Sequence, residues 1–251
     1  MTARTSTGDA VRSFGLLLRW QLLRMRGLLP LLILIQVALG VGVIYGFAFL
    51  VPQISPTVAL FFATGAPTLS LILLGLTVVP QETAQARLDG RFAYIAALPV
   101  PRLAPMLADV AFWLLVQLPG TVVTLVLANL RFHAHLRLSV WVVPAIALVA
   151  LTAAAVGYAL AVSLPPAATG QVSGFVSIAL LLFSPINFPL GRLPEVLQDI
   201  HRALPVTYMA DVVRGGLSGR YDVNPALAFA VVSAYCVLGL AVSARIARRR
   251  G

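Results

Sequence analysis

Six long apolar stretches, separated by more polar segments, limit most strongly how this chain can fold. They cover residues 28–51, 58–79, 103–129, 138–164, 171–184 and 225–244. At a rise of 1.5 Å per residue, the first is about 36 Å long as a helix, enough to cross a bilayer with some tilt. Charged residues make up only 10% of the chain, against about 25% in a typical soluble domain. The sequence therefore predicts an all-α integral membrane protein with six transmembrane helices, in one domain over residues 1–251.

The basic residues are all arginines, and the chain has no lysine and a formal net charge of +10. A phosphate-binding loop needs a lysine that reaches the β- and γ-phosphates, and a Schiff-base enzyme needs a lysine amine. The lone Cys236 excludes an intrachain disulfide and a cysteine-based metal site. We therefore expect no cofactor site in this chain, so any ATP must be bound by another chain.

Arginine counts predict the orientation of the spans. Five arginines precede the first span, three lie in residues 80–102 and four follow the last span, against six in the loops of the opposite side. Because basic residues accumulate on the cytoplasmic side, we expect both termini in the cytoplasm of a multi-pass protein of the cell membrane.

Residues 10–27 form a basic amphipathic segment before the first span. Its apolar side chains follow helical spacing, while Arg12, Arg19 and Arg26 recur every seven residues on another face and Trp20 suits the headgroup region. This pattern is typical of a helix that lies in the membrane interface. The alternative is that the segment simply begins the first span.

Residues 80–102 are the longest polar interruption in the first half of the chain. Residues 83–97 can form a helix that separates Ala84, Leu88, Tyr94 and Ile95 from most of the charges. Such a helix would lie at a membrane surface or in a partner's groove, and the alternative is an ordinary cytosolic loop. Gly90 weakens the helix by about 1 kcal/mol relative to alanine, so docking must stabilise it.

Residues 185–222 are too polar for a simple span and too apolar for a free loop. Apolar residues at helical spacing predict a helix that starts near Pro194 and ends at Pro205. Residues 207–217 can form a second helix, in which Asp211 and Arg214 are i,i+3 neighbours. We expect an extracellular re-entrant pair, which needs protein or water around its irregular backbone.

Asp109 is the only acid within a predicted span, which makes it a candidate for the substrate path or for coupling. Its alternatives are pairing with Arg102 or hydration near the membrane surface.

Asp199, His201 and Asp211 can be interpreted as a hydrolase site, but salt bridges from these aspartates to Arg202 and Arg214 are the favoured interpretation. The pair of histidines at positions 133 and 135 is a weak metal signal and better fits a solvated basic loop.

The order of these elements resembles the membrane subunit of ABC-2 type transporters, the type V ABC exporter fold. Residues 82–102 are similar to the family's coupling helix, with an acid ahead of a glycine-containing helix and a Leu-Pro-Val-Pro-Arg end. Residues 189–215 are similar to the signature before the last span, with Leu-Pro at 193–194 and 204–205, Thr-Tyr at 207–208, then Asp211 and Arg214. The family often has Gly-Thr-Leu/Glu where this chain has Gly-Arg-Phe at 90–92, a departure that concerns contact with the ATPase.

The resemblance implies a dimer with a second permease copy or a paralogue, and two cytosolic ABC ATPase subunits that bind ATP and Mg. It assigns coupling to the ATPase to Glu82, Arg87, Asp89, Gly90 and Tyr94. It assigns an outer gate to Pro194, Asp199, Pro205, Tyr208, Asp211 and Arg214. The lipid bilayer is the other expected partner, and we expect no binding of nucleic acid.

The function implied is that of a permease subunit, not an enzyme, in an ATP-driven exporter. Its substrate would be hydrophobic or amphiphilic, such as a drug, a lipid or a secondary metabolite moved out of the cytoplasm. A permease for a lipid-linked or polymeric glycan is the first alternative. Alternatives of another class are a membrane-bound enzyme acting at the outer interface and a membrane anchor of a complex.

Overall fold

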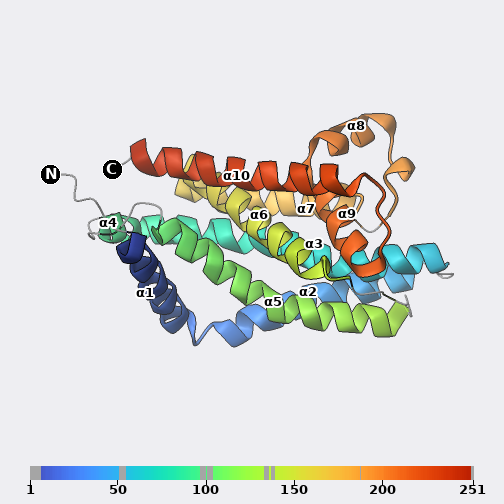
Figure 1. The fold of residues 1–251 in the computed structure, drawn as a ribbon, viewed down its shortest axis with the longest axis horizontal. Coiled ribbons are helices and arrows are strands. Elements are labelled where there is room, and N and C mark those ends of the chain that lie inside the picture. Colours follow the sequence, from blue (N-terminus) through green and yellow to red (C-terminus); the bar gives the residue numbers. More distant parts are fainter. Residues whose placement is uncertain are drawn as a thin grey trace.

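The computed structural model describes residues 7–50, 55–96, 100, 104–132, 136, 139–186 and 188–249, and every regular element in these ranges is helical (Figure 1). The long helices are α1 (Thr7–Met25), α2 (Leu29–Leu50), α3 (Pro56–Leu88), α5 (Ala104–Phe132), α6 (Val142–Ser163), α7 (Pro166–Phe183) and α10 (Pro225–Arg249). The shorter ones are α4 (Arg91–Ala96), the 3-10 helix η1 (Leu190–Arg192), α8 (Glu195–Ala203) and α9 (Pro205–Ser218). The all-α prediction is thus confirmed for the described residues.

Six of the described helices, α2, α3, α5, α6, α7 and α10, are long and apolar enough to cross a membrane. They run along the longest axis of the molecule (Figure 1). Helices α1 and α4 and the last turns of α10 lie at one end, which we call the inner end after the predicted orientation. Helices α8 and α9 lie at the opposite end, which we call the outer end.

The largest correction to the predicted boundaries concerns α3. This helix runs without a break from Pro56 to Leu88, so the predicted second span (58–79) and the first part of the predicted helix 83–97 are one element. The predicted polar stretch 80–102 begins at Pro80, and a proline within a helix removes a backbone hydrogen bond and so disfavours a continuous helix. Packing overrides that preference: a Cβ on Gly157 of α6 would meet the carbonyl of Gly75 and the ring of Pro80, so α6 lies directly against this part of α3.

The fifth span is also longer than predicted. Helix α7 begins at Pro166 rather than at residue 171, because the fixed φ of proline suits the first turn of a helix. The last span continues past residue 244 to Arg249, since arginine is a good helix former. The other spans agree with their predicted ranges to within a few residues.

Helix α3 is the centre of the bundle and packs against α2, α5, α6, α7 and α9. Of its span 89% is buried, against 22% for α2 and α7. The closest crossing is with α6, where a Cβ on Gly75 would collide with Ala153 and a Cβ on Gly157 with the Gly75 carbonyl. Both glycines are therefore required by the approach of the two backbones.

The described residues form three apolar clusters in the bundle, and the two largest lie on either side of this crossing. The cluster toward the outer end joins α3, α6, α9 and α10 through residues such as Leu71, Val149, Val212 and Val232. The cluster toward the inner end joins α1, α3, α5 and α6 through residues such as Met25, Val79, Phe112, Trp113 and Tyr158. Helices α1 and α9 are thus packed onto the bundle, and each positions a group of polar side chains.

Candidate functional site

A tight turn ends α3 at the inner end and replaces the middle of the predicted helix 83–97. Gly90 has a φ of +73°, in the left-handed region, and so closes the helix rather than weakening its interior. Asp89 caps α3 with its backbone N–H on the carbonyl of Gln85, and the Gln85 side chain donates back to the Asp89 carboxylate at 2.7 Å. The predicted single helix is therefore wrong, and α4 starts directly after the turn.

Two large side chains on either side of this turn face solvent. Leu88 at the end of α3 is 65% exposed and Tyr94 of α4 is 66% exposed. Unlike the exposed apolar side chains of the spans, they flank a charged stretch of the chain that contains Arg87, Asp89 and Arg91. The turn thus presents an apolar pair at the end of the most buried helix.

Glu82 lies between two arginines from different helices. Its carboxylate is 3.9 Å from a guanidinium nitrogen of Arg24 in α1 and 4.0 Å from one of Arg91 in α4. Arg91 also approaches Asp89 at 3.5 Å. Burial and the neighbouring charge of Arg91 lower the pKa of Arg24, although an arginine stays protonated at neutral pH. Glu82 therefore connects α1 to the turn that follows α3.

A cavity of about 30 Å³ adjoins this cluster, with walls from α1, α3, α4 and α5. Glu82, Arg24, Arg91, Asp109 and Trp113 are among its lining residues. The volume suits water and is far below the roughly 300 Å³ at which drug-sized sites begin. The structure thus brings Asp109 together with the predicted coupling residues. Its substrate-path role stays a prediction, and Arg102 lies outside the described residues.

Arg87 is turned away from this cluster. Its guanidinium donates to the carbonyls of Ala161, at 2.5 Å, and Leu164, at 2.7 Å, at the C-terminal end of α6. Carbonyls at a helix end have no partner within the helix and carry partial negative charge, so a cation stabilises them. Arg87 joins the ends of α3 and α6, and its predicted contact with the ATPase stays a prediction.

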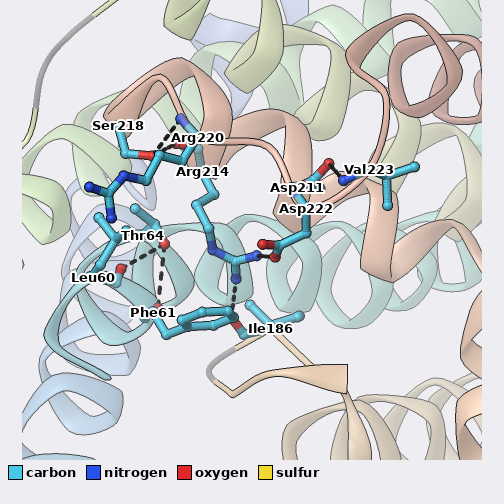
Figure 2. A network of polar contacts seen from close by, with 10 residues as sticks. All are labelled: Leu60, Phe61, Thr64, Ile186, Asp211, Arg214, Ser218, Arg220, Asp222 and Val223. Carbon is cyan, nitrogen blue, oxygen red and sulfur yellow. Dashed lines mark hydrogen bonds and ion pairs between the residues drawn. The ribbon is translucent and has the colours of Figure 1, made fainter. Parts of the chain in front are cut away.

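At the outer end, Arg214 of α9 is only 4% exposed and lies over the ring of Phe61 of α3, 3.9 Å from its centroid (Figure 2). One terminal nitrogen donates to the carboxylate of Asp222 at 2.8 Å and the other to the carbonyl of Ile186 at 3.0 Å. This guanidinium therefore joins α9, α3 and the segments on either side of the α8–α9 pair.

The predicted ion pair between Asp211 and Arg214 is not what the structure shows. Asp211 accepts hydrogen bonds from the backbone N–H groups of Asp222, at 2.7 Å, and Val223, at 3.2 Å (Figure 2). Burial raises the pKa of Asp211, and these two donors oppose that effect. Gly219, with a φ of +72°, ends α9 and turns the chain back, so that residues 222 and 223 reach Asp211.

Helix α8 is attached to the protein at its C-terminal end by what we call the hydroxyl clasp. The carbonyls of His201, Arg202 and Ala203 accept hydrogen bonds from Thr207, Tyr208 and Tyr235, at 3.1, 3.0 and 2.7 Å. Pro194 directly precedes α8, near the predicted start of that helix, whereas Pro205 begins α9 two residues before the predicted start at residue 207. The clasp therefore fixes α8 to α9 and, through Tyr235, to α10.

The side chains of Asp199, His201 and Asp211 do not converge. Asp199 forms the predicted exposed ion pair with Arg202 at 2.8 Å, His201 is a buried residue of α8, and Asp211 holds the turn after α9. The residues that the structure describes contain no group of three or more His, Cys, Asp or Glu side chains able to hold a metal ion. His133 and His135 lie outside the described residues.

Phe61, Asp222 and Tyr235 are the partners that sequence reasoning missed. For Tyr235 a signal was present, because a hydroxyl within an apolar span needs an acceptor. For Phe61 and Asp222 no local signal exists, since they meet Arg214 only through the fold.

Six of the described helices are long and apolar enough to cross a membrane and pack into one bundle, which defines a multi-pass membrane protein. The family model described as ABC-2 type transporter matches residues 13–217, so the chain belongs to the ABC-2 type transporter family. It is a membrane permease, a domain that lacks an ATP-binding site, and the family implies partnering with an ABC ATPase. No curated protein matches the chain in sequence.

Proposed function

We propose that this permease is the transmembrane subunit of an exporter that moves a hydrophobic or amphiphilic molecule out of the cytoplasm. A separate ATPase pair would bind ATP and Mg and push on the turn at Asp89 and Gly90. The observation that carries the proposal is the exposure of two large side chains on either side of this turn, Leu88 at the end of α3 and Tyr94 of α4. Force applied there acts on the helix that contacts most of the bundle.

The cluster around Glu82 supports a second point of transmission in this proposal. Because Glu82 connects to Arg24, displacement of the turn also acts on α1. Through Asp109, which lines the adjoining cavity, the start of α5 would move together with α1 and the turn. Substrate would pass between two permease copies, with α8 and α9 as the outer gate, because the cavity within one chain is too small.

The coupling assignment is tested with Leu88→Asp and Tyr94→Asp, together and singly, and with Tyr94→Phe as the matched control. The tagged chain is purified from native membranes in mild detergent, and the copurifying ATPase is quantified by mass spectrometry. We expect the double variant to lose at least about tenfold of the ATPase, since charges would replace an apolar contact, while Tyr94→Phe retains it. An unchanged ATPase yield in the double variant would remove the proposal's basis.

The predicted orientation is tested with single cysteines at Arg91 and Asp199. Cys236 is buried at 4% exposure, so the parent chain gives little background with a membrane-impermeant thiol reagent. We expect Asp199→Cys to react in intact cells and Arg91→Cys only after permeabilisation. The reverse pattern would place the coupling surface outside the cell, where no ATPase could engage it.

The substrate class is tested by reconstituting the purified complex in proteoliposomes. ATP-dependent movement of a lipophilic cationic dye supports the proposed class. Movement of a lipid-linked oligosaccharide without the dye favours the glycan alternative, and neither activity, with an ATPase bound, favours the anchor.

A further inference from the structure

The outward face of α1 and of the turn that directly follows it carries a row of arginines. Arg12, Arg19 and Arg26 are spaced by seven residues, about two helical turns, so they lie on one side of the helix. All three are exposed, whereas Gln21 and Met25 on the opposite side are buried against the bundle. The row spans about 21 Å along the helix axis.

These three arginines differ in their partners from Arg24, which lies in α1. Arg24 approaches Glu82, but no described carboxylate lies within 4.0 Å of Arg12, Arg19 or Arg26. Three unpaired cations thus face outward from a helix whose other side is packed. Such a row attracts an anionic partner.

Leucines on the same face indicate which anionic partner fits. Leu16 and Leu23 lie between the arginines and are 58% and 54% exposed. A face that mixes long apolar and basic side chains suits the bilayer interface, where leucines enter the acyl region and guanidinium groups stay at the phosphates. Only a short turn separates Met25 of α1 from Leu29 of the first span, so the membrane surface is within reach.

We propose that the face formed by Arg12, Leu16, Arg19, Leu23 and Arg26 is a binding surface for anionic phospholipid headgroups. Each guanidinium would hold a lipid phosphate through paired N–H donors, a geometry that arginine offers and lysine does not. The inference rests on the chain being a membrane protein and does not depend on the transport that we propose.

Lipid binding at this surface can be measured through the fluorescence of Trp20, because this residue lies in α1 and is exposed beside the surface. Trp113 is buried at 2% exposure, and Trp141 precedes α6 next to Gly216 of α9 at the outer end, where Trp141→Phe removes its signal. The full chain carrying Trp141→Phe is placed in phosphatidylcholine nanodiscs with a fixed fraction of either brominated phosphatidylglycerol or brominated phosphatidylcholine. Quenching of tryptophan fluorescence then reports which lipid is enriched near α1.

We expect brominated phosphatidylglycerol to quench at least about twofold more strongly than brominated phosphatidylcholine, since a basic residue near an anionic surface favours it severalfold. The triple variant R12Q/R19Q/R26Q should lose this preference. The matched control R131Q/R202Q/R220Q removes three exposed arginines from the outer end and should keep it. The lysine variant R12K/R19K/R26K keeps the charge, so it should keep most of the preference and show that the fold tolerates changes on this face.

Equal quenching by the two lipids in the parent chain would overturn the proposal, as would a preference that survives in R12Q/R19Q/R26Q. If that variant keeps its lipid preference but loses the copurifying ATPase, the row binds the ATPase and not the membrane. Loss of transport with the lipid preference intact would count against the proposed function alone.

Discussion

The two ends of the bundle use the same kinds of side chain in opposite ways. At the inner end, Glu82, Arg24 and Arg91 are partly exposed and their ion pairs measure 3.9 and 4.0 Å. At the outer end, Arg214 is buried, pairs with Asp222 at 2.8 Å and lies over an aromatic ring. Exposed, long pairs contribute about 0 to 1 kcal/mol, whereas an unpaired buried charge is strongly unfavourable.

This contrast teaches where the molecule can rearrange without losing its fold. Water can replace the partners of Glu82, so the turn after α3 can move at small cost. Water cannot replace the partners of Arg214 in the same way, because burial excludes it. The inner end is therefore suited to receive a partner, and the outer end to keep its geometry until a larger force acts.

The strongest test of the contrast is Asp222→Ala. This variant leaves the buried guanidinium of Arg214 without its counter-charge. We expect the free energy of unfolding to fall by about 3 kcal/mol, the low end of the range for a broken buried ion pair, because the side chain of Asp222 is itself 59% exposed. Unfolding in detergent, followed by scanning fluorimetry, measures it.

The matched control is Asp199→Ala, which removes the same side chain from the exposed pair with Arg202 and should cost less than about 1 kcal/mol. Equal shifts in Tm for the two variants would show that burial does not separate the ends.

The next effect concerns the crossing that separates the two ends. Gly157→Ala places a methyl group against the backbone carbonyl of Gly75, and we expect about 1–3 kcal/mol of destabilisation. Gly174→Ala is the control, because a Cβ there meets nothing within 4 Å and alanine favours the helix. Thermal unfolding of both variants should give shifts of opposite sign, and matching shifts would argue against a close α3–α6 contact.

A smaller effect is expected at the hydroxyl clasp. Tyr235→Phe removes the donor to the Ala203 carbonyl and keeps the ring, so we expect about 0.5–1.5 kcal/mol of local stability to be lost. Hydrogen exchange of residues 195–203 should accelerate. Tyr45→Phe, in α2, removes a hydroxyl without a described partner and should leave that segment unchanged; acceleration in both variants would mean that α8 is not held by the clasp.

The smallest effect on stability, and the sharpest on function, is expected for Glu82→Gln. Its partners are partly exposed and the ion pairs are long, so Tm should change little, while loss of the link between α1 and the turn should uncouple ATP hydrolysis from transport. Glu195→Gln makes the same chemical change on α8, where no coupling role is proposed. Normal ATP-driven transport by Glu82→Gln in proteoliposomes would refute the coupling role.

Hydrophobic length predicted the six spans, because a membrane span depends mainly on local composition. It failed for α3, where Pro80 and the polar residues after it resemble a loop while contact with α6 keeps them helical. Spacing within a helix also paired Asp211 with Arg214. The actual partner, Asp222, arrives through the left-handed turn at Gly219, which i,i+3 reasoning cannot see. The contacts that the sequence did not predict are those between side chains that come together only in the folded structure.

The length of α3 has a mechanical consequence. Its 33 residues form a rod of about 50 Å that reaches from the turn at Gly90 past Phe61 under Arg214. Gly75, where the rod meets α6 most closely, is about 20 Å from its inner end and about 28 Å from its outer end. A rod turning about this crossing is a lever with unequal arms, so an inner displacement of about 2 Å becomes roughly 3 Å in the opposite direction outside. The position of the crossing at Gly75, rather than either end of α3, then sets how far the outer end moves when the ATPase displaces the inner end.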